Sequence, residues 1–431
     1  MMLLLLFAVL IVLLFLGMDI GISMGVSSLV YLLFTFLGPS PINLTLIPQK
    51  MQNAVDSFPL MAIPLFILAG ELMNRGGVTH RLVRFATAVV GHITGGLAQV
   101  TVFVNMIMAG MSGSAVADAA ATGAVLIPSM VKSGFPSAFA SAVTAAAGTL
   151  GPVIPPSIAF VIIGTMVDVS VGRLFLGGAL PGIFFGLSMM AAVYWVARRE
   201  GYPKAPRASL ADLRTGIRDA GLALLMPFFV LGAIVSGITT PTEAAGVAVI
   251  YSLLLGVFVY REIGWRDVLH ICVDTAQGTA AIMLTIATAV LFGWLATAEQ
   301  MGPKFAAALF GVTQNKVLVL LVINIFLLLL GCLMEGIPII LILSPILFQI
   351  AKQVGVDPVH FGVMFTVNVM IGMVTPPIGL NLFVVSAISR TPVWEIARAA
   401  VPFMILMTAA LMVITFYPPM TLWLPNLLMG K

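Results

Sequence analysis

Short clusters of small and oxygen-bearing residues interrupt the long apolar runs of this 431-residue sequence at two places. The first place holds Met111-Ser112-Gly113-Ser114 and the stretch from Gly148 to Pro156. The second holds the stretches from Cys332 to Gly336 and from Gly372 to Gly379. Hydroxyl groups, and carbonyls at glycines where no Cβ obstructs them, can ligate a small hard cation without a buried full charge. The clusters therefore predict two equivalent sites for Na+, and two or more ions.

The residues expected around these ions form two matching sets. They are Ser112, Ser114, Gly148, Gly151 and Val153 at the first site, and Gly331, Gly336, Gly372, Met373 and Thr375 at the second, with Glu335 beside them. Small residues are equally suited to close packing between membrane helices, which is the alternative interpretation of the first set. The recurrence of the pattern downstream favours ion binding.

The proline pair Pro155-Pro156 stands directly before Ser157, and the pair Pro376-Pro377 stands close to Gly379. Proline is favoured in the first turn of a helix, so a half-helix is expected to begin after each pair. Helix N-termini carry positive partial charge and free N–H groups, which suit a carboxylate. These stretches contain no arginine, so the helix ends are the predicted attraction for an anionic substrate. The alternative is that the prolines only kink the spans.

Ionisable and amide side chains in apolar surroundings are costly and indicate function. Glu335 is the stronger candidate for substrate contact, and Asp118 is the weaker one because its carboxylate can pair within its own hairpin. Asn368 is equally suited to the site and to a hydrogen bond between helices. The complete set of expected substrate contacts is Ser114, Ser157, Glu335, Asn368 and Gly379.

The composition places these clusters inside a lipid bilayer. Hydrophobic residues make up 61% of the chain and charged residues 8%, which leaves too little polar surface for a water-soluble protein of this size. The basic residues lie in short groups between apolar runs, so nucleic-acid binding is excluded. An intramembrane enzyme has no support either, because no HExxH motif and no nucleophile beside a base occurs.

Eight apolar runs approach the length needed to cross about 30 Å of hydrocarbon. They lie near 2–16, 20–37, 59–74, 174–197, 220–236, 241–260, 276–297 and 401–424. Two further apolar stretches are interrupted, and non-helical backbone at this depth requires a cavity or surrounding protein. We therefore predict a helical hairpin at 94–132 with a broken span at 136–167, and the same pair again at 317–389.

The two interrupted stretches share their spacing. Pro136 precedes Pro155 by nineteen residues, and Pro358 precedes Pro376 by eighteen. When the basic segment from Arg198 to Arg218 is placed in the cytoplasm, fourteen of the twenty Lys and Arg residues lie on that side. Both termini are then outside, and the two hairpins enter from opposite faces. The fold predicted is all-α, with inverted repeats that favour alternating access.

Five motifs in order carry a resemblance to a known family: GMSGSAVADAAATGAVLIPSM, GTLGPVIPPS, TPTEAAGVAV, GCLMEGIPIILILSPIL and DPVHFGVMFTVNVMIGMVTPPIGLNLF. The chain resembles the large membrane subunit of tripartite ATP-independent periplasmic (TRAP) transporters over essentially its whole length. It departs from the family pattern at Met18-Asp19, in the first tight turn, where the family usually carries a proline.

The resemblance implies a sodium-coupled, elevator-type importer of an organic anion such as a C4-dicarboxylate or sialic acid, in the bacterial inner membrane. It also implies a separate small four-span membrane subunit and a periplasmic solute-binding protein. Amphipathic arms are expected at 78–92 and 302–315. The implied division is scaffold and first arm (1–93), first transport repeat (94–173), scaffold and second arm (174–316), second transport repeat (317–390) and terminal scaffold helix (391–431).

Two other kinds of transport protein fit part of the pattern. A stand-alone sodium/anion transporter shares hairpins and broken spans but needs no binding protein. A channel is less consistent with the pattern, because closed tips and duplicated breaks indicate sites that bind and release a solute.

Overall fold

The computed structural model describes residues 2–36 and 44–430, and in these ranges the ordered elements are helices. Eight of the helices are long and apolar enough to cross a membrane. In chain order the helices are α1 (Met2–Phe15), α2 (Ile20–Phe36), α3 (Leu46–Val55), η1 (Phe58–Met61), α4 (Ala62–Arg75), α5 (Val78–Val90), α6 (Gly96–Ser112), α7 (Ala115–Lys132), α8 (Ser137–Gly148), α9 (Ile158–Val167), α10 (Val171–Glu200), α11 (Leu210–Val235), α12 (Pro241–Leu254), η2 (Leu255–Val259), α13 (Trp265–Ala298), α14 (Met301–Val312), α15 (Lys316–Gly331), α16 (Gly336–Gln353), α17 (Pro358–Gly372), α18 (Leu380–Ser389), α19 (Val393–Phe416) and α20 (Pro419–Met429).

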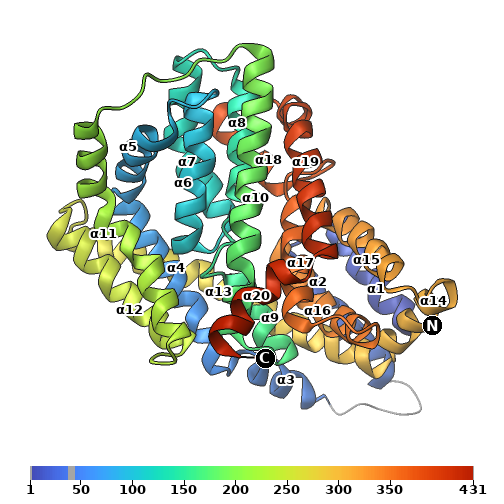
Figure 1. The fold of residues 1–431 in the computed structure, drawn as a ribbon. Coiled ribbons are helices and arrows are strands. Elements are labelled where there is room, and N and C mark those ends of the chain that lie inside the picture. Colours follow the sequence, from blue (N-terminus) through green and yellow to red (C-terminus); the bar gives the residue numbers. More distant parts are fainter. Residues whose placement is uncertain (1, 37–43, 431) are drawn as a thin grey trace.

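Two sets of four helices follow one plan (Figure 1). In the first set, α6 and α7 form a hairpin and α8 and α9 form a broken span. In the second set, α15 and α16 form the hairpin and α17 and α18 the broken span. Corresponding helices have 17, 18, 12 and 10 residues in the first set, and 16, 18, 15 and 10 in the second. The predicted repeats are confirmed.

Local chemistry explains where the first hairpin turns. Gly113 has φ +62°, a left-handed conformation that glycine adopts without a steric cost, and it ends α6. An added Cβ there would lie 3.1 Å from the backbone nitrogen of Ile158, so the turn also sits tightly against the first break. Ser114 then caps α7, with its Oγ accepting a hydrogen bond from the Ala117 N–H at 3.4 Å.

The two repeats interlock through their half-helices. Helix α18 packs against α7 and α8, and α9 packs against α16 and α17. Asn381, near the start of α18, donates a hydrogen bond of 3.1 Å to the Ala145 carbonyl in α8. The long helices α10 and α19 pack against helices of both repeats. The repeats therefore form one joint body rather than two separate halves.

The first hairpin has its open end beside the loop that follows α10. An added Cβ on Gly96, at the start of α6, would lie 3.0 Å from the Pro203 carbonyl. Ala205 N–H donates to the Gly91 carbonyl at 3.0 Å, just before the same hairpin. This end of the molecule carries the basic segment that begins at Arg198.

The second hairpin has its open end at the other end of α10. His360 Nδ1, in the first turn of α17, lies 2.8 Å from Thr421 Oγ1 of α20. Arg173, in the first turn of α10, donates 2.7 Å hydrogen bonds to the Gly430 carbonyl and to Asn426 Oδ1. Because the 30 residues of α10 span about 45 Å, the two hairpins open to opposite faces. The inverted topology is confirmed.

Helices α1 and α2 coincide with the apolar runs predicted near 2–16 and 20–37, and both are short for a complete span. They have 14 and 17 residues, or about 21 and 26 Å, which is shorter than the hydrocarbon core. Ser27 in α2 donates to the Leu6 carbonyl in α1, so the helices pack side by side. Helix α2 runs along the second half of α13. Gly21 packs against Thr285, and the Tyr31 hydroxyl donates a hydrogen bond to Glu299, just after the end of α13. The pair is a third hairpin, and the predicted last residue of its second span, 37, lies outside the described residues.

Both predicted arms are helical, and the first is held by ion pairs. Arg84 of α5 pairs with Asp219 of α11 at 2.8 Å, and Arg81 pairs with Glu262 at 3.2 Å. Arg81 also lies over the Tyr260 ring, 4.1 Å from its centroid. Surface pairs of this kind are individually weak, so orientation of α5 rests on the group acting together.

The inverted topology predicts opposite labelling of two exposed loop positions. In a background with Cys272 and Cys332 replaced by alanine, Ala208→Cys and Gln314→Cys should react with a membrane-impermeant maleimide from opposite sides. Both positions are exposed and uncharged, so the substitutions leave the basic loop intact. Labelling of both cysteines from one side in intact cells and inverted vesicles would contradict the fold.

Candidate functional site

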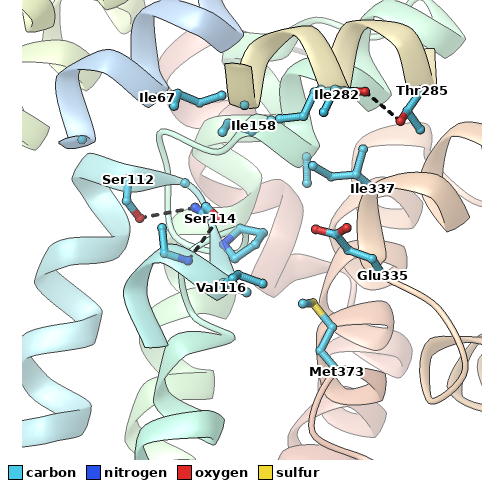
Figure 2. A pocket seen from close by; sticks show the side chains of 18 of the residues that line it. Ile67, Ser112, Ser114, Val116, Ile158, Ile282, Thr285, Glu335, Ile337 and Met373 are labelled. Atoms are coloured by element: carbon cyan, nitrogen blue, oxygen red, sulfur yellow. Dashed lines mark hydrogen bonds between the residues drawn. The ribbon is translucent and has the colours of Figure 1, made fainter. Parts of the chain in front are cut away.

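A cavity of about 270 Å³ lies where the three hairpin turns meet. Its walls come from both hairpin tips and the turn before α2, from Pro152 and the start of α9, from Met370 and Met373, and from the C-terminal half of α4 and the middle of α13. Figure 2 shows Ser114, Glu335 and Met373 around this space. The volume is at the small end for ligand sites, which usually measure about 300–1,000 Å³, so a small solute fits.

The first hairpin presents a helix N-terminus to the cavity. Residues 114–117, the cap and first turn of α7, line it. Ser114 N–H donates to Ser112 Oγ at 3.3 Å, and the Ser112 hydroxyl donates to Asp118 Oδ1 at 2.5 Å. The early N–H groups of a helix have no intrahelical partners and carry positive partial charge. This wall can therefore attract a carboxylate.

Behind that wall, Asp118 faces the first break. Asp118 is fully buried, and its Oδ2 has no hydrogen-bond partner among the described residues. An added Cβ on Gly151 would lie 2.7 Å from this oxygen and 2.9 Å from the Ser114 carbonyl oxygen. Gly148 approaches equally closely, at 2.8 Å from the Ala115 carbonyl. The break thus brings glycine backbone against three oxygens, an arrangement suited to a small cation.

The second hairpin meets its break in a similar way. An added Cβ on Gly372 would lie 2.3 Å from Gly331 Cα, so the two backbones are in direct contact. Gly336, the first residue of α16, lies against Met370, where an added Cβ would be 2.5 Å from the Met370 Cε. The Thr375 hydroxyl donates to the Ile371 carbonyl at 2.8 Å. Gly331, Gly336, Gly372 and Met373 therefore lie close together, whereas the Thr375 hydroxyl is bonded within its own segment.

Glu335 points its carboxylate into the cavity (Figure 2). It forms no ion pair or hydrogen bond with another described residue. Asp19 and Glu71 also line the cavity, while none of the described lining residues is Lys, Arg or His. The Arg75 guanidinium, which pairs with the lining residue Glu71 at 3.8 Å, also pairs with Asp274 at 2.5 Å. The cavity consequently carries more negative than positive side-chain charge.

Three expected substrate contacts lie elsewhere. Ser157 caps α9, donating to the Pro152 carbonyl at 2.5 Å and accepting from Phe160 N–H at 3.3 Å. Asn368 donates to the Asn324 backbone and side-chain oxygens at 3.0 and 2.6 Å, which is the helix-to-helix bond named as its alternative. Gly379 has φ +58° and donates to the Cys332 carbonyl at 3.4 Å.

Val153, expected at the first ion site, has different surroundings from the other residues of that set. Its carbonyl faces α10, where an added Cβ on Gly178 would lie 2.7 Å from the oxygen.

The sequence did not single out the contributions of α2, α4 and α13, or the turn residue Asp19. A signal for Asp19 existed in the sequence, namely the departure from the family pattern at Met18-Asp19. For the helices, no local pattern distinguishes the cavity face from other faces.

Comparison with known proteins gives one consistent answer. The family model described as "Tripartite ATP-independent periplasmic transporter, DctM component" matches residues 7–420. The chain is 42% identical to the C4-dicarboxylate TRAP transporter large permease protein DctM of Pseudomonas aeruginosa, covering 94% of each chain. It is 38% identical to the sialic acid TRAP transporter large permease protein SiaM of Vibrio cholerae, covering 97% of each. The isethionate TRAP transporter permease protein DctMQ of Oleidesulfovibrio alaskensis is 40% identical over 93% of this chain and 63% of that protein.

Solved structures resemble the chain in fold. The YdaH transporter of Alcanivorax borkumensis superposes with a TM-score of 0.63 at 15% identity, covering 90% of each chain. MtrF of Neisseria gonorrhoeae gives 0.58 at 13% identity, covering 94% of each. At such identities the likeness concerns the arrangement of helices alone.

The close glycine contacts predict a strong effect of one added methyl group. Gly151→Ala and Gly372→Ala should each lower stability by about 1–3 kcal/mol, because the new Cβ meets backbone atoms that cannot rotate away. Gly293→Ala is the matched control, since nothing lies within 4 Å of an added Cβ there and alanine favours a helix interior. Thermal unfolding in detergent measures the difference. Equal melting temperatures for all three variants would contradict the packing described.

Proposed function

The chain belongs to the family of the DctM component of tripartite ATP-independent periplasmic transporters, and we propose that it imports a small organic carboxylate together with sodium ions. The observation that supports this most directly is the cavity bounded by both hairpin tips, with the first turn of α7 facing it. Relatives named for C4-dicarboxylate, sialic acid and isethionate transport carry organic acids, which agrees with a carboxylate solute.

Sodium coupling is proposed from the chemistry at the tips. At the first tip, Ser114 and Asp118 supply a carbonyl and an unpaired carboxylate oxygen opposite Gly151. Ser112, Gly148 and Val153 complete the first proposed set. At the second tip, the proposed ligands are Gly331, Gly336, Gly372, Met373 and Thr375. Hard cations prefer oxygen ligands, and unwound backbone at midplane is the usual source of them in secondary transporters.

The proposed movement is of the elevator type. The interlocked repeats would move as one body that carries the tips past α2, α4 and α13, which line the opposite wall of the cavity. The arm α5, held by its ion pairs to Asp219 and Glu262, would anchor the hairpins to the static helices. Alternating access then follows from two positions of one body around a fixed wall.

The proposed setting is the bacterial inner membrane with both termini in the periplasm. The basic loop at one end of α10 would lie in the cytoplasm, and Arg173 ties the C-terminal segment to the other end. A small four-helix membrane subunit and a periplasmic binding protein are the proposed partners. The relatives named as TRAP large permeases favour this assembly over a stand-alone transporter.

Uptake should depend on an inward sodium gradient. In liposomes that contain the chain, its small subunit and its binding protein, removal of Na+ or of the binding protein should abolish accumulation of the solute. A proton gradient in sodium-free buffer should not restore it, because the proposed ligands are mostly neutral oxygens. Full uptake under that condition would disprove sodium coupling.

Loss of the Thr375 hydroxyl should weaken sodium dependence. If this hydroxyl ligates an ion, Thr375→Val should cost about 1–3 kcal/mol, a five- to more than hundredfold rise in the Na+ concentration for half-maximal uptake. Thr366→Val is the matched control, because Thr366 makes the same bond to the carbonyl four residues earlier, at 2.9 Å, within α17. An equal sodium response in both variants would exclude Thr375 as a ligand.

A further inference from the structure

Asp19 stands out among the residues of the cavity. It occupies the turn between α1 and α2. Helix α1 ends and α2 begins near the middle of α13. The turn between them therefore lies at the cavity instead of at a membrane surface. Asp19 is exposed toward this space, so a solute in the cavity can reach its carboxylate. An ionisable side chain at membrane depth indicates function.

One role of Asp19 is structural and does not require charge. Its Oδ1 accepts hydrogen bonds from Gly21 N–H at 2.8 Å and Ile22 N–H at 3.4 Å, which caps α2. Asp357 caps α17 with nearly the same geometry, accepting from Val359 at 2.8 Å and His360 at 3.3 Å. Asparagine and serine cap helices about as well as aspartate. The cap therefore explains an oxygen at position 19 but not its negative charge.

The surroundings of Asp19 provide no positive partner. Asp19 and Glu335 line the same cavity, and neighbouring carboxylates of like charge repel each other. Arg75 is already engaged by Glu71 and Asp274. No Lys, Arg or His belongs to the lining within the described ranges. A purely anionic solute would enter against this charge, whereas a solute with its own cationic group would be held by it.

We propose that Asp19 is a specificity-determining residue: together with Glu335 it selects a carboxylate that also carries a cationic nitrogen, such as an amino acid. The carboxylate of the solute faces the first turn of α7, and the ammonium faces Asp19 and Glu335 across the cavity. Charge-assisted hydrogen bonds to an ammonium offset the cost of two neighbouring carboxylates. This inference rests on the proposed function and narrows its substrate class.

The same pair of carboxylates could instead attract a coupling ion. The proposed first sodium site differs in position, because Asp118 Oδ2 faces Gly151 and Asp118 does not line the cavity. The cavity is also larger than a desolvated ion requires. The solute's nitrogen is therefore the better match, and the experiment must separate it from Na+.

The experiment measures binding to the purified full chain in nanodiscs, with no binding protein present. The probes are matched pairs that differ by one amino group: succinate and L-aspartate, glutarate and L-glutamate, butyrate and 4-aminobutyrate. Dissociation constants come from the ligand-dependent rise in melting temperature at fixed, high Na+. The sodium response without solute is titrated separately. Because no uptake is involved, failure of import and failure of this inference are distinguishable.

In the wild type, the dissociation constant of at least one amino-bearing probe should be at least tenfold lower than that of its counterpart without the amino group. Asp19→Asn and Asp19→Ser, which keep a cap, should reduce that ratio to near one and leave the Na+ titration unchanged. Glu335→Gln should reduce the same ratio. Asp357→Asn, the matched cap control away from the cavity, should preserve it.

Three outcomes would overturn the inference. The first is a wild type that prefers no amino-bearing probe. The second is an Asp19→Asn variant that folds and keeps the wild-type ratio. The third is an Asp19→Asn variant in which the Na+ titration shifts while the ratio stays, which would assign Asp19 to the coupling ion.

Discussion

Backbone that leaves the helix inside a membrane must find its partners within the protein, and this constraint governs the whole arrangement. At the second break, Ile378 N–H bonds to the Cys332 carbonyl of the hairpin at 3.2 Å, and Asn381 N–H bonds to the Met373 carbonyl at 3.1 Å. Such bonds require the hairpin tip to touch the break. Glycines make that approach possible, with Gly331 directly against Gly372. Tip and break therefore form one packed unit.

Three acidic side chains lie at the tips and at the cavity. Asp118 is buried against the first break, with one oxygen bound by Ser112 and the other free. Asp19 and Glu335 face the cavity, where a solute can reach them. The basic residues of the first arm lie apart from these groups, in pairs with Asp219 and Glu262. This separation fits a protein in which one set of charges binds cargo and another holds the arm.

Much of the architecture follows from one-dimensional pattern. The two interrupted stretches, their proline pairs and the distribution of Lys and Arg led to hairpins, broken spans and inverted repeats, all of which the structure shows. These features are readable because each depends on local preferences: glycine where backbone turns, proline where a helix begins, and hydrophobic length for crossing. The short pair α1 and α2 was harder, because an apolar run of nearly spanning length does not reveal its depth.

The sequence by itself determined the kind of protein, the positions of the breaks and the residue types available for ions, since these depend on near neighbours along the chain. Only the tertiary structure decided which side chains meet. It placed Ser157 and Asn368 in hydrogen bonds away from the cavity, set Asp118 opposite Gly151, and brought Asp19 and Glu335 into the lining of one cavity. The physical reason is that the cavity is built from seven separate segments of the chain, and their mutual packing depends on contacts between residues far apart in sequence.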